Sequence, residues 1–395
     1  MNHSPTAARL ATRIKRLNSS LVREILAIAN KPGMISFAGG LPAPDLMPDM
    51  RDCVDLDAAL DQYGASEGET VFREAVADWI THNGLPVAPS QVLALSGSQQ
   101  GLDLAAKLLI EDGTPIVTES PSYLAAQVFE LFGARVLPLQ LGSNGPDPVA
   151  LDALLREQRP SCVYLIPSFQ NPSACCYTPE VRKAIAEVID RHDVVLIEDD
   201  PYRSVSLDVS HPMLPICASL KRAPWIYLGS FSKILRPGWR VGYLAASPQL
   251  MPYLVRLKQA SDLHTQRPAQ VAVANWLRHP QRDADLARLR AGYRVRRDAM
   301  QAALERHFGD LADWEVPQGG LFFWLRLRRH QATRATLDAT LARGVVFMPG
   351  ESFYPDAQKP TNTMRLNYSL ATPAEMEQGL AVLADCLLAE DSALR

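Results

Sequence analysis

Residues 162–197 read CVYLIPSFQNPSACCYTPEVRKAIAEVIDRHDVVLI. Two short apolar runs, Cys162–Ile166 and Val194–Ile197, enclose an amphipathic stretch, Pro179–Arg191. Apolar runs that do not alternate with polar residues are typical of strands buried on both faces of a parallel sheet. The segment therefore predicts a strand, a covering helix and a second strand parallel to the first.

The same alternation extends over the middle of the chain. A further amphipathic stretch lies at Gly101–Glu111, and further short apolar runs lie at Val92–Leu95, Ile116–Val117, Val136–Leu139, Trp225–Leu228 and Gly242–Ala245. We therefore expect an α/β fold in which residues 47–283 form a large domain. Its mainly parallel, seven-stranded sheet is expected to be covered by helices on both faces.

The pattern changes after about residue 282. A long charged helix is predicted at Ala284–His307, strands at Gly319–Leu325 and Thr363–Tyr368, and an Ala/Leu-rich helix at the end of the chain. The first 46 residues are too few to fold alone. We therefore expect residues 1–46 and 284–395 to form a smaller α+β domain together.

Composition excludes several classes of function. The 395 residues include 40 basic and 43 acidic side chains, a net charge of −3, so nucleic acid is a poor candidate for a partner. No apolar window reaches the roughly 18 residues of a membrane helix, and we expect no membrane association. The six cysteines show neither metal-ligand spacing nor a disulfide framework, which favours the cytoplasm. Residues 9–23 are basic and faintly resemble a transit peptide, but a basic lead-in to the mature fold is the preferred interpretation.

Four polar segments follow apolar runs directly. They are Ser96–Gly101, Pro167–Pro172, Glu198–Arg203 and Gly229–Arg240. In open α/β sheets, ligands bind beyond the carboxyl ends of the strands, where these segments are expected. Each has a plain structural alternative when taken alone: a serine helix cap, an Asn-Pro turn, an acidic turn and a solvated lysine.

Together the four segments offer a consistent chemistry. The amine of Lys233, in a loop of small residues, is suited to a Schiff base with a carbonyl. Ser230, Ser232 and Arg240 are suited to a phosphate, as are backbone N–H groups where a helix begins near Ser98.

In their order along the chain, the segments resemble the fold-type-I pyridoxal-phosphate aminotransferases of class I/II. The matching motifs are Ser-Gly-Ser-Gln-Gln at 96–100, Gln-Asn-Pro at 170–172, Asp-x-x-Tyr at 199–202 and Ser-x-Ser-Lys at 230–233, with Arg240 downstream. The resemblance covers nearly the whole chain. ISFAGGLPAP at 35–44 and LKQASDLHT at 257–265 are similar to the branch of 2-aminoadipate and kynurenine aminotransferases.

The resemblance implies a role for each site residue. Lys233 would form the Schiff base and carry a proton once released. Asp199 would keep the pyridine nitrogen protonated, which deepens the electron sink. Tyr202 and Asn171 would hydrogen-bond the phenolic oxygen of the cofactor, and Tyr123 would stack on its ring.

Further residues would hold the phosphate and the substrate. The phosphate would be bound by Ser98, Gln99, Ser230, Ser232 and Arg240. Tyr63 would reach the phosphate of a neighbouring subunit, which implies a homodimer whose active site is shared across the interface. The α-carboxylate of the substrate would meet Arg365, the Gly40 backbone and Asn171. Arg23 would meet a distal carboxylate, although pairing with a surface acid is its plain alternative.

One departure from the family pattern lies beside Asn171. Thr-Gly commonly follows Gln-Asn-Pro, whereas Ser173-Ala174 stands here, followed by Cys175-Cys176. Alanine at position 174 requires a negative φ or a strained backbone.

We therefore expect an aminotransferase that moves an amino group between 2-oxoglutarate and an L-amino acid, either 2-aminoadipate or a broad aromatic and aliphatic set. A lyase or decarboxylase on the same fold is one alternative, because the cofactor motifs are shared. A non-catalytic ligand sensor behind a DNA-binding module is another. We expect no such module here, because the matching segment begins near Ser20.

Overall fold

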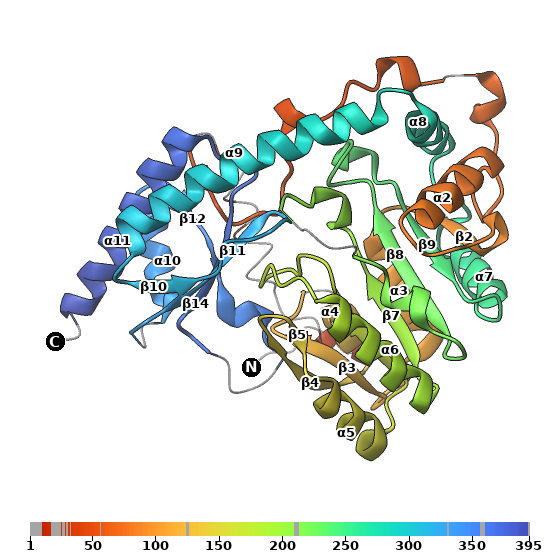
Figure 1. The fold of residues 1–395 in the computed structure, drawn as a ribbon, viewed down its shortest axis with the longest axis horizontal. Helices are drawn as coiled ribbons and strands as arrows, with labels where there is room; N and C mark the ends of the chain where they lie inside the picture. Colours follow the sequence, from red (N-terminus) through yellow and green to blue (C-terminus); the bar gives the residue numbers. More distant parts are fainter. Residues whose placement is uncertain are drawn as a thin grey trace.

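The computed structural model of the chain describes residues 10–16, 25, 28, 31, 33–55, 57–123, 126–208, 213–329, 332–355 and 360–393. Within these ranges, eight strands form one large sheet in the order β2-β9-β8-β7-β6-β3-β4-β5 (Figure 1). Their bounds are β2 Val92–Leu95, β3 Pro115–Ser120, β4 Arg135–Gly142, β5 Gly145–Pro146, β6 Cys162–Leu165, β7 Val195–Asp199, β8 Trp225–Ser230 and β9 Gly242–Ala246. All seven predicted apolar runs form strands, and the unpredicted eighth, β5, has two residues.

Strand direction brings the polar segments to one edge of the sheet. Strands β8, β7, β6, β3 and β4 are parallel, whereas β9 is antiparallel to both β8 and β2. Two reversals restore the direction, so β2 runs the same way as β8. The segments that follow β2, β6, β7 and β8 therefore leave the sheet at the same edge.

Helices cover both faces of the large sheet. Alternate residues of a strand face opposite sides. In β6, Cys162 and Tyr164 pack in one apolar cluster, while Val163 and Leu165 pack in another. The first cluster includes residues of α3 (Ser98–Leu109), α4 (Ala126–Leu131) and α7 (Met251–Asp262), and the second includes residues of α2 (Thr70–His82), α5 (Pro148–Gln158), α6 (Pro179–His192) and α8 (Arg267–Arg278). The predicted α/β architecture is confirmed.

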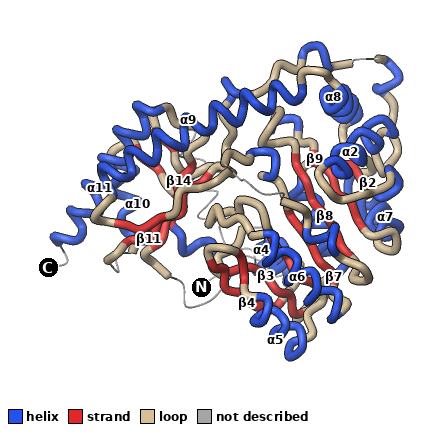
Figure 2. The backbone as a smooth tube through the Cα atoms, viewed as in Figure 1, coloured by secondary structure: helices blue, strands red, loops and turns tan. Residues whose placement is uncertain are grey.

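A smaller antiparallel sheet lies apart from the large one (Figure 2). Its order is β10-β11-β14-β13, with bounds Ala312–Trp314, Phe322–Leu327, Thr363–Asn367 and Met348–Pro349. The accompanying helices are α9 (Arg282–Phe308), α10 (Thr333–Ala342) and α11 (Pro373–Ala393). Helix α9 runs from the neighbourhood of α8 to α11 and so links the two parts (Figure 1).

Residues 35–36 of the N-terminal segment pair with a strand from the C-terminal part of the chain. Strand β1 (Ile35–Ser36) pairs in parallel with β12 (Val345–Val346). The exact limits of the two domains, residues 47–283 and 284–395 with 1–46, stay a prediction. Within the described part of the chain, no helix is long and apolar enough to cross a lipid bilayer.

The strand predicted from Gly319 begins only at Phe322 because two glycines pass the Phe169 ring. A Cβ on Gly319 would lie 2.5 Å from that ring, and Gly320 has a φ of +73°. Close approach and a left-handed backbone both require glycine at this point.

The loop after β6 carries Asn171 and also Ala174, whose backbone conformation the sequence does not decide. Ala174 has a φ of +60°, in the left-handed region. Its N–H donates to the Gln170 carbonyl oxygen at 2.6 Å, and the side-chain oxygen of Gln170 accepts from the N–H of Ser173 at 2.9 Å. The hydrogen bonds of Gln170 thus hold an alanine in a conformation that glycine adopts more readily.

We predict that Ala174→Gly stabilises the protein, because it removes the left-handed strain. The free energy of unfolding should rise by about 1 kcal/mol, measured by urea denaturation. Ala184→Gly, the same change inside helix α6, is the matched control and should lower it by a similar amount. A loss of stability in Ala174→Gly would contradict the interpretation.

Candidate functional site

A cavity of about 150 Å³ opens at the carboxyl ends of β6, β7 and β8. It is lined by Ser98, Gln99, Tyr123, Ile166, Asn171, Asp199, Pro201, Tyr202, Ser230, Ser232, Lys233 and Arg240. Ten of these are residues that the sequence analysis selected. The structure thus brings together segments that are up to about 140 positions apart in the chain, as the strand directions require.

Lys233 lies just beyond β8 and is half-buried. Its Nζ donates a hydrogen bond to the Gly40 carbonyl oxygen at 2.9 Å and lies 5.7 Å from the centroid of the Tyr202 ring. Burial, together with the positive charges of Arg365 and Arg240, lowers the pKa of Lys233 to about 8. About one tenth of this amine is therefore neutral, and nucleophilic, at pH 7, and about half of it at pH 8.

Asp199 is the last residue of β7 and is only 3% exposed. Tyr164, from the neighbouring strand β6, donates its hydroxyl to Oδ2 of Asp199 at 2.9 Å. The other carboxylate oxygen, Oδ1, is buried without a hydrogen-bond partner among the described residues. Burial raises the pKa of Asp199 to about 7, and the nearby charge of Asp200 adds to the increase. The site thus contains a buried carboxyl group with one oxygen that has no hydrogen-bond partner among the described residues.

Arg365 reaches the site from β14 of the small sheet and is 4% exposed. One guanidinium nitrogen donates to Asn171 Oδ1 at 2.6 Å, and another donates to the carbonyl oxygen of Ala38. The guanidinium carbon lies 4.2 Å from the centroid of Phe322 and 4.9 Å from that of Phe353. Burial lowers the pKa of Arg365 to about 10, but the group stays charged at neutral pH. A fixed cation is therefore held where the two parts of the chain meet.

The opposite end of the cavity is suited to an anion. Helix α3 begins at Ser98, and Gly97 before it has a φ of +84°. This φ favours glycine, and the backbone of Gly97 lies close to the guanidinium of Arg240. Arg240 also donates to Ser232 Oγ at 3.4 Å, and Ser230 Oγ accepts from the Ser232 N–H at 3.2 Å. Helix N–H groups, hydroxyls and a guanidinium converge here.

Two tyrosines flank the cavity. Tyr202 is buried and follows β7, and its hydrogen bond to Asn171 partly offsets the rise in its pKa that burial causes. Tyr123 donates its hydroxyl to Gln99 Oε1 at 3.4 Å, and burial raises its pKa also. Both are therefore neutral hydrogen-bonding groups at neutral pH.

Three predicted site residues lie among the described residues but do not line this cavity: Tyr63, Gly40 and Arg365. Tyr63 is 76% exposed, and its ring meets the edge of His264 at a centroid distance of 5.8 Å. Arg23 lies outside the described residues. Gly40 contributes its carbonyl oxygen to Lys233, as described above.

Sequence reasoning missed three residues that shape the site. Tyr164 lies inside an apolar run and was interpreted as core, while Phe322 and Phe353 were not singled out. The period of two along the strand places Phe322 and Trp324 on one face, but only the fold shows that this face meets Arg365.

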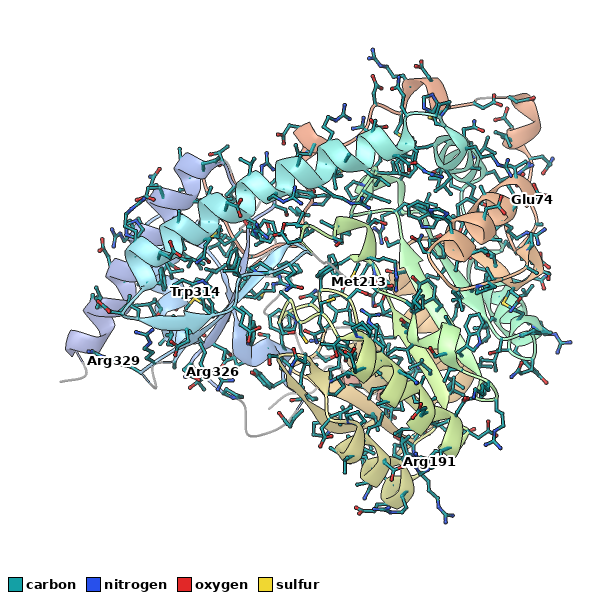
Figure 3. All side chains as sticks on the ribbon, in the orientation of Figure 1. Glu74, Arg191, Met213, Trp314, Arg326 and Arg329 are labelled. Atoms are coloured by element: carbon teal, nitrogen blue, oxygen red, sulfur yellow. The ribbon has the colours of Figure 1, made fainter. Side chains whose placement is uncertain are left out.

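A second cavity, of about 340 Å³, contains none of the predicted site residues. It lies between the loop at Ser173 and the small sheet, whose Trp314 and Arg326 are labelled in Figure 3. Among the described residues, no group of three or more His, Cys, Asp or Glu side chains could hold a metal ion.

Comparison with known proteins identifies the family. The sequence model described as aminotransferase class I and II matches residues 7–383. The chain belongs to this family. The 2-aminoadipate transaminase of Thermus thermophilus is 36% identical to this aminotransferase, and the match covers 94% of each chain. Aromatic-amino-acid aminotransferase 1 of Thermococcus litoralis is 34% identical over 95% of this chain and 93% of that protein.

A solved structure supports the same family. The α-aminoadipate aminotransferase of Thermus thermophilus, complexed with N-(5'-phosphopyridoxyl)-L-leucine, has a TM-score of 0.89 and 34% identity, covering 99% of this chain and 100% of that one. The protein is a transaminase, and its cofactor is pyridoxal phosphate. The family, fold and cofactor expected from the sequence are confirmed.

We predict that Asp199→Asn changes how the stability of the apoenzyme depends on pH. The ordinary pKa of the carboxyl is 3.8, and burial raises it to about 7 in the folded state. Between these values the folded protein binds a proton that the unfolded chain does not, so wild-type stability falls as the pH rises from about 4 to about 7. The variant lacks this loss, and its relative stability should grow over that range by a few kcal/mol, at about 1.4 kcal/mol per pH unit.

Thermal denaturation from pH 4 to pH 8 measures the difference. Asp310→Asn, at an exposed aspartate, is the control and should follow the wild type at each pH. A constant offset between Asp199→Asn and the wild type across this range would show that Asp199 is not a buried acid with a raised pKa.

Proposed function

We propose that this aminotransferase moves an amino group between 2-oxoglutarate and an L-amino acid, either 2-aminoadipate or a broader aromatic and aliphatic set, with Lys233 as the lysine that binds pyridoxal phosphate covalently. The observation that carries the proposal is the half-buried Lys233 amine, which lies in one cavity with Asp199 and with a set of anion-binding residues. We call this set the anion cradle; it consists of Ser98, Gln99, Ser230, Ser232 and Arg240. The activities that the names of the two relatives give support the choice of amino acids.

The cavity fits the two ends of the cofactor. Pyridoxal phosphate supplies an electron sink for the electron pair left when a proton leaves the substrate Cα. The unpartnered Oδ1 of Asp199 would accept from the protonated ring nitrogen. The anion cradle would hold the phosphate through Ser98, Gln99, Ser230, Ser232 and Arg240.

Three side chains between these ends would orient the ring. Tyr202 and Asn171 would hydrogen-bond its phenolic oxygen, and Tyr123 would cover one face. Both tyrosines stay protonated because burial raises their pKa, so each can donate. These residues would hold the ring at a fixed angle to Lys233.

Arg365 would bind the α-carboxylate of the substrate. Its Nε is buried without a hydrogen-bond partner among the described residues, which leaves a donor for a carboxylate. Asn171 accepts a hydrogen bond from Arg365, and the Gly40 carbonyl oxygen accepts one from Lys233. With the carboxylate fixed there, the Lys233 Nζ would take and return the proton at the substrate Cα.

Two further assignments concern Tyr63 and Arg23. The exposure of Tyr63 is consistent with its reaching the phosphate site of a second subunit in a homodimer. Arg23 would meet the distal carboxylate of a dicarboxylic substrate. A cytoplasmic location stays a prediction.

A panel of amino donors with 2-oxoglutarate and pyridoxal phosphate tests the activity. We expect 2-oxoglutarate to be converted to glutamate as 2-aminoadipate, or an aromatic or aliphatic amino acid, is converted to its 2-oxo acid. Lys233→Ala should lower kcat by about 10³-fold. Borohydride reduction followed by peptide mapping should place the cofactor on Lys233.

Two results would contradict the proposal. Conversion of the amino acid without any 2-oxo acid would indicate a lyase or decarboxylase. Labelling of another lysine, such as the buried Lys258, would overturn the assignment of Lys233.

A further inference from the structure

Lys258, on helix α7, is a buried cation outside the cavity. The residue is 0% exposed. Its Nζ donates to Gln100 Oε1 at 2.7 Å, to Thr265 Oγ1 at 2.8 Å and to Asp262, whose carboxylate oxygens lie at 2.8 and 2.9 Å. All three N–H groups of the ammonium can thus be used, and Asp262 balances its charge.

This cluster holds both ends of the turn that begins the anion cradle. Gln100 accepts from the Ser96 N–H at 2.9 Å and donates to Asp262 at 2.8 Å. The Ser96 hydroxyl also donates to Asp262, at 3.2 Å. Ser96 and Gln100 enclose Gly97, Ser98 and Gln99, so the cluster fixes the backbone that presents the N–H groups at the start of α3.

A second arm of the cluster leads toward Tyr63. The Thr265 carbonyl oxygen accepts from Gln270 Nε2 at 2.7 Å and lies 3.0 Å from Nδ1 of His264. The His264 ring meets the Tyr63 ring, and Gln270 Oε1 accepts from the N–H of Glu69 at 2.8 Å. The same buried ammonium therefore supports two segments that the proposed function assigns to the phosphate.

We propose that Lys258 is a positioning residue for the cofactor phosphate. It acts through Gln100 on Ser98 and Gln99, and through Thr265 on the segment that carries Tyr63. The inference rests on the proposed phosphate site. It assigns a role to the Leu257–Thr265 motif, none of whose residues lines the cavity. Because the cluster touches only the phosphate end, its loss should weaken recognition of the phosphate and spare that of the ring.

Comparison of two probes, pyridoxal phosphate and pyridoxal, tests this role. In Lys258→Met the dissociation constant of pyridoxal phosphate should rise about tenfold, as expected when charge-assisted hydrogen bonds in a buried cluster are lost. The dissociation constant of pyridoxal, which lacks the phosphate, should change by less than about twofold, within the variation expected of a group that the cluster does not touch. Equilibrium dialysis of the purified full-length enzyme with each probe gives both constants.

Lys107→Met is the matched control. Lys107 lies at the same α3–α7 contact, donates to Ser261 Oγ at 3.2 Å and pairs with Asp103, but is partly exposed. We expect both constants to stay at the wild-type values. Should Lys258→Met fail to fold, Thr265→Val removes one acceptor with little change of shape and should weaken pyridoxal phosphate about threefold while sparing pyridoxal.

The outcomes separate this inference from the proposed function. Equal weakening of both probes would show that Lys258 only supports the fold, and unchanged binding of both would show that it does not position the cradle. Either result overturns the inference while leaving the proposed function intact. Failure of the wild type to bind pyridoxal phosphate covalently would instead refute the proposed function.

Discussion

The site depends on charged groups that are removed from water without a full set of protein partners. Asp199 has one carboxylate oxygen with no partner among the described residues, and Arg365 has one such N–H group. Burial raises the pKa of Asp199 and lowers the pKa values of Lys233 and Arg365, and so favours the neutral form of each group. Charges held in this way cost folding free energy, and a ligand that supplies the missing partners recovers it.

The rest of the fold keeps these groups at fixed positions. Asp199 and Lys233 follow adjacent strands of the large sheet, while Arg365 comes from the small sheet and meets Asn171 of the large one. Glu119 fixes the loop that carries Asn171. Its carboxylate accepts hydrogen bonds from Gln170 Nε2 at 2.9 Å and from the Ile166 N–H at 3.0 Å. Both sheets must therefore be in place before Arg365 is held beside the cavity that Asp199 and Asn171 line.

Much of this arrangement follows from sequence patterns. The apolar runs specify the strands, and a parallel sheet puts the residues after Leu95, Ile166, Ile197 and Leu228 at one edge. The role of Tyr164 could not be predicted, because its contact with Asp199 depends on the register between two strands. The positive φ of Ala174 was left open because it depends on the hydrogen bonds that Gln170 accepts from Ser173 and Ala174, which the motif does not predict.

Burial and two nearby guanidinium groups lower the pKa of the Lys233 amine, which should allow it to react near neutral pH. The rate at which the apoenzyme captures pyridoxal phosphate, followed by absorbance from pH 6 to pH 11, tests this most directly. We predict a rate that rises with pH to a plateau with a midpoint at about 8, because only the neutral amine attacks the aldehyde. In Arg365→Met, which removes one of the two positive charges, the midpoint should move upward. A midpoint near 10.5, the ordinary value for lysine, would contradict the account.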